Sequence, residues 1–146
     1  MKLLFVCTGN TCRSPMCEAA FRDMLEKNGM DQEVSCSSAG ISAIPEPASF
    51  NARKAVEEAG LSLDAHTARQ FTRELAEDAD WIVAVSPSHY NAILRIAPEA
   101  EAKAGLLCST GISDPFGGDL SVYRACFAEI RNALKELFKT IIIQKG

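Results

Sequence analysis

The sequence has no long hydrophobic run and no excess of positive charge. Its apolar stretches, such as residues 81–85 and 141–143, fall far short of the roughly 20 residues that span a bilayer. Fifteen basic and nineteen acidic side chains give a net charge of −4, which excludes the broad basic surface that holds nucleic acid or an anionic membrane. We therefore expect no nucleic-acid partner and no membrane partner, and any bound anion must be held locally.

Cysteine is too sparse for a disulfide scaffold. The chain has six cysteines in 146 residues, and the apolar stretch that follows Met1 and Lys2 is too short for a signal peptide. These features predict a cytoplasmic protein with free thiols. The six are Cys7, Cys12, Cys17, Cys36, Cys108 and Cys126.

Strands and helices alternate along the chain, with no repeats or linkers. Apolar runs predict strands at residues 2–6, 33–38, 80–86 and 104–108, and helical periodicity predicts helices at 14–28, 47–59, 87–97 and 119–143. In these helices, Ser14 and Asp119 are the expected N-caps and Pro15 the first helical residue. We expect a single domain over residues 1–146, monomeric, with the α/β fold: a three-layer sandwich with a central four-stranded parallel sheet and helices on both faces.

The segment between the first strand and the first helix carries the chemistry. Cys7 and Arg13 are separated by five small or polar residues, at the edge of the sheet where ligands of parallel sheets bind. Backbone N–H groups of such a loop and the helix N-terminus can surround a tetrahedral anion, and Arg13 can clamp two of its oxygens. Gly9 and Asn10 give the loop conformational freedom. We call this anion-binding loop the anion cradle, and we expect it to lower the pKa of the Cys7 thiol. The predicted anion-binding loop includes Thr8, Gly9, Asn10, Thr11, Cys12 and Ser14.

Each cysteine also has a simpler interpretation. Cys7 alone would be read as a small buried hydrophobe, but the combination with the loop and Arg13 favours the anion cradle. Cys12 is either a thiol packed beneath the loop or a redox partner of Cys7. The remaining cysteines are interpreted as core thiols. A metal site at Cys7, Cys12 and Cys17 has no CxxC pair and would occupy the cradle, so no metal is expected.

Four segments carry a resemblance to a known family. Residues 6–19, VCTGNTCRSPMCEA, closely resemble the active-site segment of the low-molecular-weight protein tyrosine phosphatase family. Residues 37–40 match its second-strand motif, residues 66–70 its histidine-containing segment, and residues 114–115 its general-acid loop. The resemblance covers the whole chain.

The resemblance implies a cysteine-dependent protein phosphatase that forms a phosphocysteine intermediate. In that family's pattern Cys7 is the nucleophile, Arg13 binds the phosphoryl group and Asp114 is the general acid. Ser14 hydrogen-bonds the Cys7 thiolate, and three further residues support the loop: Asn10, Ser38 and His66. The implied partners are phosphorylated protein substrates, and no cofactor is expected. His89 has no match and is predicted to face solvent.

Asp114 suits acid and base catalysis on physical grounds as well. The following Pro115 disfavours a helical conformation at Asp114, and Gly117 and Gly118 allow the loop to reach the site and move. A carboxylic acid there could protonate the leaving group and then, as a carboxylate, activate water. Without the resemblance, Asp114 could equally be a turn residue.

Two positions bear on the substrate. Tyrosine-directed members of the family usually carry an apolar residue where this sequence has Thr11, and an aromatic pair where it has only Phe116. TGNTCRS together with DPFGG resembles the bacterial protein arginine phosphatase branch, so we expect phosphoarginine in preference to phosphotyrosine.

Two other functions remain open at this point. An arsenate reductase of this fold needs a relay pair of cysteines after the third strand, and residues 81–92 contain none. A non-catalytic phospho-residue binding module needs neither Cys7 nor Asp114.

Overall fold

The computed structural model describes residues 1–145 and contains one four-stranded parallel sheet in the order β2-β1-β3-β4. Its strands are β1 (Lys2–Cys7), β2 (Ser35–Gly40), β3 (Trp81–Ala84) and β4 (Ala104–Leu106). The first strand is therefore central, paired on both sides, which accounts for its continuous apolar sequence. The predicted parallel sheet is confirmed.

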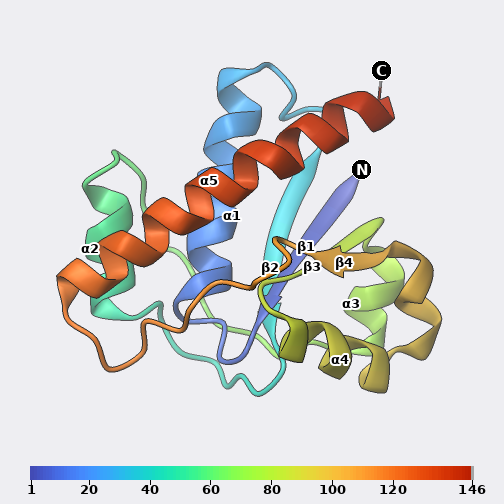
Figure 1. Cartoon of the computed structure of the whole chain (residues 1–146), viewed down its shortest axis with the longest axis horizontal. Coiled ribbons are helices and arrows are strands. Elements are labelled where there is room, and N and C mark those ends of the chain that lie inside the picture. The colour runs from blue at the N-terminus through green and yellow to red at the C-terminus, as the bar shows by residue number, and fades with distance from the viewer. Residues whose placement is uncertain (146) are drawn as a thin grey trace.

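Helices cover both faces of the sheet (Figure 1). One face packs against α1 (Arg13–Lys27), α2 (Phe50–Glu57) and α5 (Leu120–Lys145), and the other against α3 (Arg73–Asp78), α4 (Pro87–Ile96) and the 3-10 helix η1 (Pro98–Lys103). Alternate residues of β1 enter the two cores, because successive strand side chains point to opposite faces. The three-layer sandwich is confirmed. No helix in residues 1–145 is long and apolar enough to cross a membrane.

The start of α1 differs from the prediction. The helix begins at Arg13, with Cys12 at the N-cap position and no side-chain cap bond. Ser14 does not cap the helix because its hydroxyl contacts Cys7 and Asn10 instead. Pro15 still lies in the first turn, where its missing N–H costs nothing.

The predicted second helix is shortened at its start. It begins at Phe50, after an N-cap in which the Ser49 hydroxyl accepts a hydrogen bond from Ala52 N at 3.3 Å. Pro47 instead forms an isolated bridge with Thr67. This bridge holds the segment before α2 against the segment that contains His66.

The final helix follows its predicted apolar stripe. The periodicity that predicts this helix lies in six apolar residues at steps of three and four, of which five are buried and Leu137 is half-buried. Asp119 caps the helix as predicted, since its Oδ1 accepts a hydrogen bond from Val122 N at 3.2 Å. The buried stripe fixes α5 across α1 and α2. It consists of Tyr123, Phe127, Ile130, Leu134 and Ile141.

Candidate active site

The phosphate loop, defined here as residues 7–14, leaves the carboxyl end of the central strand. Cys7 is the last residue of β1 and pairs with Gly40 of β2. Arg13 is the first residue of α1, so the five residues between them must turn the chain from strand to helix. The loop therefore lies where the N-terminal N–H groups of α1 face the same space as the Cys7 sulfur.

Asn10 holds the loop in its turned shape. It has a φ of 58°, the left-handed conformation that asparagine adopts more readily than most residues. Its Nδ2 donates to Ser14 Oγ at 2.8 Å and to Ser38 Oγ at 2.9 Å, and its Oδ1 accepts from Arg69 N at 2.9 Å. His66 Nε2 donates to the Asn10 carbonyl at 2.7 Å. Every polar group of this side chain thus ties the loop to the body of the protein.

The loop also packs tightly against the end of β2. A Cβ on Gly40 would lie 2.5 Å from the Thr8 carbonyl oxygen and 2.9 Å from Asn10 N. Both are backbone atoms, which cannot yield without moving the loop. Gly9 has no such crowding and no positive φ, so the conformational freedom expected at Gly9 is not used.

The Cys7 sulfur is surrounded by hydrogen-bond partners. Ser14 Oγ lies 2.9 Å from Sγ and Ser14 N donates to it at 3.4 Å. Cys7 is only 2% exposed, and this burial raises the pKa of its thiol, against the lowering effect of Ser14, the Asn10 N–H group and Arg13. The expected lowered pKa is therefore wrong, because removal from water outweighs those contacts.

Arg13 and Asp114 face each other across the site. Arg13 Nη1 donates to the Ile112 carbonyl at 2.9 Å, and its Nη2 lies 3.6 Å from Asp114 Oδ2. The Arg13 side chain is buried, whereas that of Asp114 is 55% exposed. Asp114 Oδ1 accepts a hydrogen bond from Phe116 N at 3.0 Å, which braces the turn. The guanidinium is thus fixed and the carboxyl group is open to substrate and water.

A pocket of about 350 Å³ opens above the Cys7 sulfur. It brings together most of the predicted site residues. Asn10 and Ser14 belong to the loop but do not line the pocket, and Ser38 and His66 support the loop through Asn10. Ser42 and Glu46 were not predicted to line it. They lie in the segment after β2, which the rule that ligands bind beyond the carboxyl ends of parallel strands indicates, although it does not show which side chains of that segment turn into the pocket. The lining comprises Cys7, Thr8, Gly9, Thr11, Cys12, Arg13, Ser42, Glu46, Asp114 and Phe116.

His89 does not face solvent, contrary to the prediction. It is 5% exposed, with Nε2 2.8 Å from Thr8 Oγ1 and Nδ1 2.8 Å from Ser86 Oγ. Burial, reinforced by the positive charge of Arg13, lowers the pKa of His89 to about 4, and Asp114 acts in the opposite direction. The imidazole is neutral near pH 7. Its position shortly after β3 places it at the edge of the sheet where the site lies, and this position could have indicated a role near the site from the sequence.

The cysteines are all free thiols. Cys12 Sγ lies 3.4 Å from both Ser49 Oγ and Tyr123 Oη. Cys17, Cys36 and Cys126 are buried as expected, and burial raises the pKa of Cys36 and of Cys126 to about 12. Cys108 is only half-buried at the margin of the core, so it is not the fully buried core thiol that was predicted.

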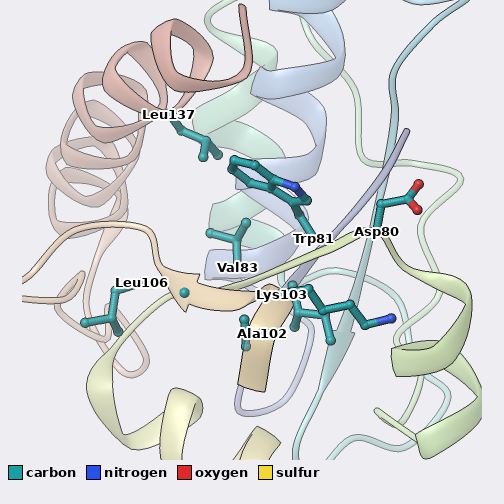
Figure 2. A pocket seen from close by; sticks show the side chains of 10 residues that line it. Asp80, Trp81, Val83, Ala102, Lys103, Leu106 and Leu137 are labelled. Atoms are coloured by element: carbon teal, nitrogen blue, oxygen red, sulfur yellow. The ribbon is translucent and has the colours of Figure 1, made fainter. Parts of the chain in front are cut away.

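No metal cluster competes with this site in the part of the chain that the structure describes. Among residues 1–145, no three His, Cys, Asp or Glu side chains are placed to hold a metal ion. A hollow of about 480 Å³ beside β4 is larger than the phosphate pocket. Figure 2 shows Trp81, Val83 and Leu137 gathered there, with the Lys103 ammonium turned away; that ammonium donates to the Ala79 carbonyl at 2.6 Å. The lining of this hollow has no cysteine, serine, threonine or histidine.

Comparison with known proteins identifies the family. The sequence model of low molecular weight phosphotyrosine protein phosphatases matches residues 2–145. The chain belongs to this family. Among relatives in this phosphatase family, a protein-arginine-phosphatase of Bacillus subtilis is 36% identical over 97% of both chains. A low molecular weight protein-tyrosine-phosphatase of Streptomyces coelicolor is 40% identical over 83% of this chain and 75% of its own.

Solved structures of the phosphatase family show the same fold. A YwlE arginine phosphatase mutant with a phosphorylated active-site serine superposes with a TM-score of 0.91, at 34% identity, over 97% of this chain and 95% of its own. The YwlE arginine phosphatase of Geobacillus stearothermophilus gives 0.89 at 32% identity, over 99% and 94% of the two chains.

Proposed function

We propose that this protein is a cysteine-dependent phosphatase that hydrolyses phosphorylated side chains of cytoplasmic proteins. Its preferred substrate is phosphoarginine, and it acts as a monomer. The observation that carries the proposal is the placement of Cys7, Arg13 and Asp114 around one pocket. A nucleophile, an anion clamp and a carboxyl group within one small pocket are the parts that phosphoryl transfer through a covalent intermediate requires.

In the first step the Cys7 sulfur attacks the phosphorus atom. Because burial favours the protonated thiol, a phosphoryl oxygen of the substrate takes the thiol proton, and Ser14 stabilises the thiolate that forms. Arg13 and the loop N–H groups bind the phosphoryl oxygens as charge shifts between them. Asp114 gives its proton to the leaving atom of the side chain. The products are the dephosphorylated side chain and a phosphocysteine.

In the second step water hydrolyses the phosphocysteine. Asp114 is now a carboxylate, and its exposed position lets it accept a proton from an incoming water molecule. The water oxygen attacks phosphorus, the bond to Cys7 Sγ breaks, and inorganic phosphate is released. One structural neighbour is consistent with this course, since the YwlE mutant carries a phosphoryl group on its active-site serine.

The chemistry of the pocket favours phosphoarginine over phosphotyrosine. Glu46 and Asp114 place two carboxyl groups in a pocket whose cationic side chain is Arg13, and a guanidino group offers several N–H donors that carboxyl oxygens accept. Thr11 adds a polar wall where an aromatic ring would prefer an apolar one. Phe116, which is 82% exposed, is the feature that favours phosphotyrosine, because it could stack on the ring.

Matched phosphopeptides test the proposal. Two peptides of one sequence, carrying either phosphoarginine or phosphotyrosine, are incubated with the wild type and with Cys7→Ser. We expect hydrolysis of both by the wild type, a higher kcat/KM for phosphoarginine, and no turnover by Cys7→Ser. Equal or lower kcat/KM for phosphoarginine would assign the protein to phosphotyrosine, and turnover by neither would contradict the phosphatase proposal.

We also propose that Cys12 protects Cys7 during oxidation. Peroxide oxidises the Cys7 thiol to sulfenic acid and is itself reduced to water, and the Cys12 thiol then displaces a second water molecule to form a disulfide. Cys12 must first leave Ser49 and Tyr123. After peroxide and then dithiothreitol, we expect the wild type to recover most of its activity and Cys12→Ser much less. Equal recovery would exclude Cys12 from this role.

A further inference from the structure

A chain of polar groups runs from the surface of α4 to the phosphate loop. Ser88 Oγ lies 3.0 Å from Ser86 Oγ, which lies 2.8 Å from His89 Nδ1. On the other side of the ring, His89 Nε2 lies 2.8 Å from Thr8 Oγ1. Ser88 is exposed, His89 is buried, and Thr8 lines the phosphate pocket. No step of the proposed mechanism uses this chain.

The N-terminus of α4 lacks a side-chain cap because the Ser86 hydroxyl takes part in this polar chain. Ser86 occupies the N-cap position with an extended backbone, at φ −148° and ψ 165°, and Pro87 follows as the first helical residue. A serine at this position normally accepts a hydrogen bond from the backbone N–H two or three residues on. Here the Ser86 side chain makes no cap bond and contacts the His89 ring. The arrangement therefore fixes the imidazole instead of the helix end.

The neutral imidazole has one N–H donor and one acceptor nitrogen, so the chain can run in two directions. In one direction the Thr8 hydroxyl donates to Nε2 and Nδ1–H donates to Ser86. In the other, Ser86 donates to Nδ1, Nε2–H donates to Thr8 Oγ1, and the Thr8 proton is left to point into the pocket. Phosphoryl oxygens only accept hydrogen bonds, so a phosphoryl group in the pocket selects the second direction.

We propose that His89 is a positioning residue, which directs the Thr8 hydroxyl toward the phosphoryl group of the substrate. Its role rests on the proposed phosphatase function but is separable from it, because it concerns the binding of the phosphoryl group and not the attack by Cys7. Thr8 is well placed to transmit the effect. Its carbonyl accepts a hydrogen bond from Ser42 N at 2.9 Å, so backbone and side chain are held from two sides. Removal of the imidazole frees only the hydroxyl.

A double-mutant cycle tests this role. Thr8→Val and His89→Leu are made singly and together, and the inhibition constant of inorganic phosphate is measured with kcat and KM for p-nitrophenyl phosphate. We expect each single variant to weaken phosphate binding and to raise KM by about three- to tenfold, the usual effect of one lost hydrogen bond, with kcat changed less. The double variant should bind phosphate no more weakly than Thr8→Val. Asn91→Ala, at an exposed position on α4, is the matched control and should leave the inhibition constant of phosphate, kcat and KM unchanged.

Two conservative variants keep the test decisive if His89→Leu does not fold. Glutamine places its amide near the position of Nε2 and keeps a contact with Thr8, whereas asparagine reaches only toward Ser86. We expect His89→Gln to retain phosphate affinity and His89→Asn to lose it. In the wild type, nitrogen NMR should show the Nε2–H tautomer of His89 once inorganic phosphate is added.

Three results would overturn the role. The first is a double variant whose loss of phosphate affinity is the product of the two single-variant losses. The second is a set of His89 variants that lower the thermal unfolding midpoint but leave phosphate affinity unchanged. The third is an Nδ1–H tautomer of His89 in the presence of phosphate. The failure of the proposed function has a different signature. A wild type that hydrolyses no phosphorylated substrate would contradict the phosphatase proposal, while phosphate affinity measured by calorimetry in the same variants would still decide the role of His89.

Discussion

At the scale of single residues, Cys7 combines deep burial with a nucleophilic task. Cys7 is almost completely buried at the base of the pocket, so the reactivity of its sulfur depends on Ser14, the loop N–H groups and Arg13. We expect Cys7→Ser to lose several orders of magnitude in kcat, because a hydroxyl in the same place ionises far less readily than a thiol. Calorimetry should show that the variant still binds inorganic phosphate. Cys108→Ser, at a half-buried free thiol, is the control and should keep full activity.

Asp114 should reveal its role through the leaving group. Asp114→Asn cannot donate a proton, so we expect it to slow aryl phosphates with poor leaving groups by about a hundredfold or more, and activated ones less. The measurement is kcat/KM across a series of aryl phosphates of increasing phenol pKa. A dependence as shallow as that of the wild type would contradict the acid role.

Thr11 is the residue at which substrate choice can be changed. Thr11→Ile replaces a hydroxyl in the pocket lining with an apolar group, which suits an aromatic ring and leaves a guanidino N–H without an acceptor. We expect the ratio of kcat/KM for phosphotyrosine to that for phosphoarginine to rise about tenfold, measured with the matched peptides. A ratio that stays constant or falls would place discrimination at Phe116 or Glu46.

At the scale of elements, the end of β2 shapes the phosphate loop. Gly40→Ala would press a methyl group against the Thr8 carbonyl and the Asn10 N–H, so the loop must shift. We expect about a hundredfold loss of kcat/KM, since a displacement of about 1 Å at reacting groups has that effect. Gly105→Ala in β4 is the matched control, because its Cβ meets nothing within 4 Å. Equal activities of the two variants would show that the loop tolerates the shift.

The elements that the sequence predicts are those with a long or strong pattern. The apolar run of β1 is long enough to indicate a strand buried on both faces, and the apolar stripe of α5 recurs often enough to define its buried face. The residues between Cys7 and Arg13 fit an anion-binding loop between a strand and a helix. The helix α3 and the 3-10 helix η1 have six residues each, too few for a period to emerge. The missed pocket residues, Ser42 and Glu46, come from a loop whose path depends on contacts distant in the sequence, such as Ser42 N with the Thr8 carbonyl.

At the scale of the whole molecule, the parallel sheet collects the site from segments far apart in the chain. β1 ends at the nucleophile, the segment after β2 supplies Ser42 and Glu46, and the first turn of α4, which follows β3, supplies His89. The segment after β4 brings Asp114 to the same edge. Because each contribution follows a strand that ends at one edge, the fold explains why residues 7 and 114 share a pocket. The sequence indicates the edge, but the side chains that turn inward depend on the packing of all four segments.

His89 also links this assembly to the stability of the entire fold. Burial, followed by repulsion from Arg13, lowers its pKa from an ordinary value of 6.5 to about 4, so the unfolded chain binds a proton at pH values where the folded protein does not. The contribution of His89 to the free energy of unfolding is therefore fully present above pH 6.5 and is lost as the pH falls toward 4. Between pH 7 and 4.5 we expect a loss of about 2 kcal/mol from this group.

Denaturant unfolding of the wild type and His89→Gln at a series of pH values measures this contribution. The carboxylates titrate in both proteins, so the difference between the two curves isolates His89. We expect the wild type to lose its advantage over the variant as the pH falls from 7 to 4.5, because glutamine takes up no proton in either state. Parallel curves would mean that the imidazole binds a proton equally well when folded, which its burial and its neighbour Arg13 both oppose.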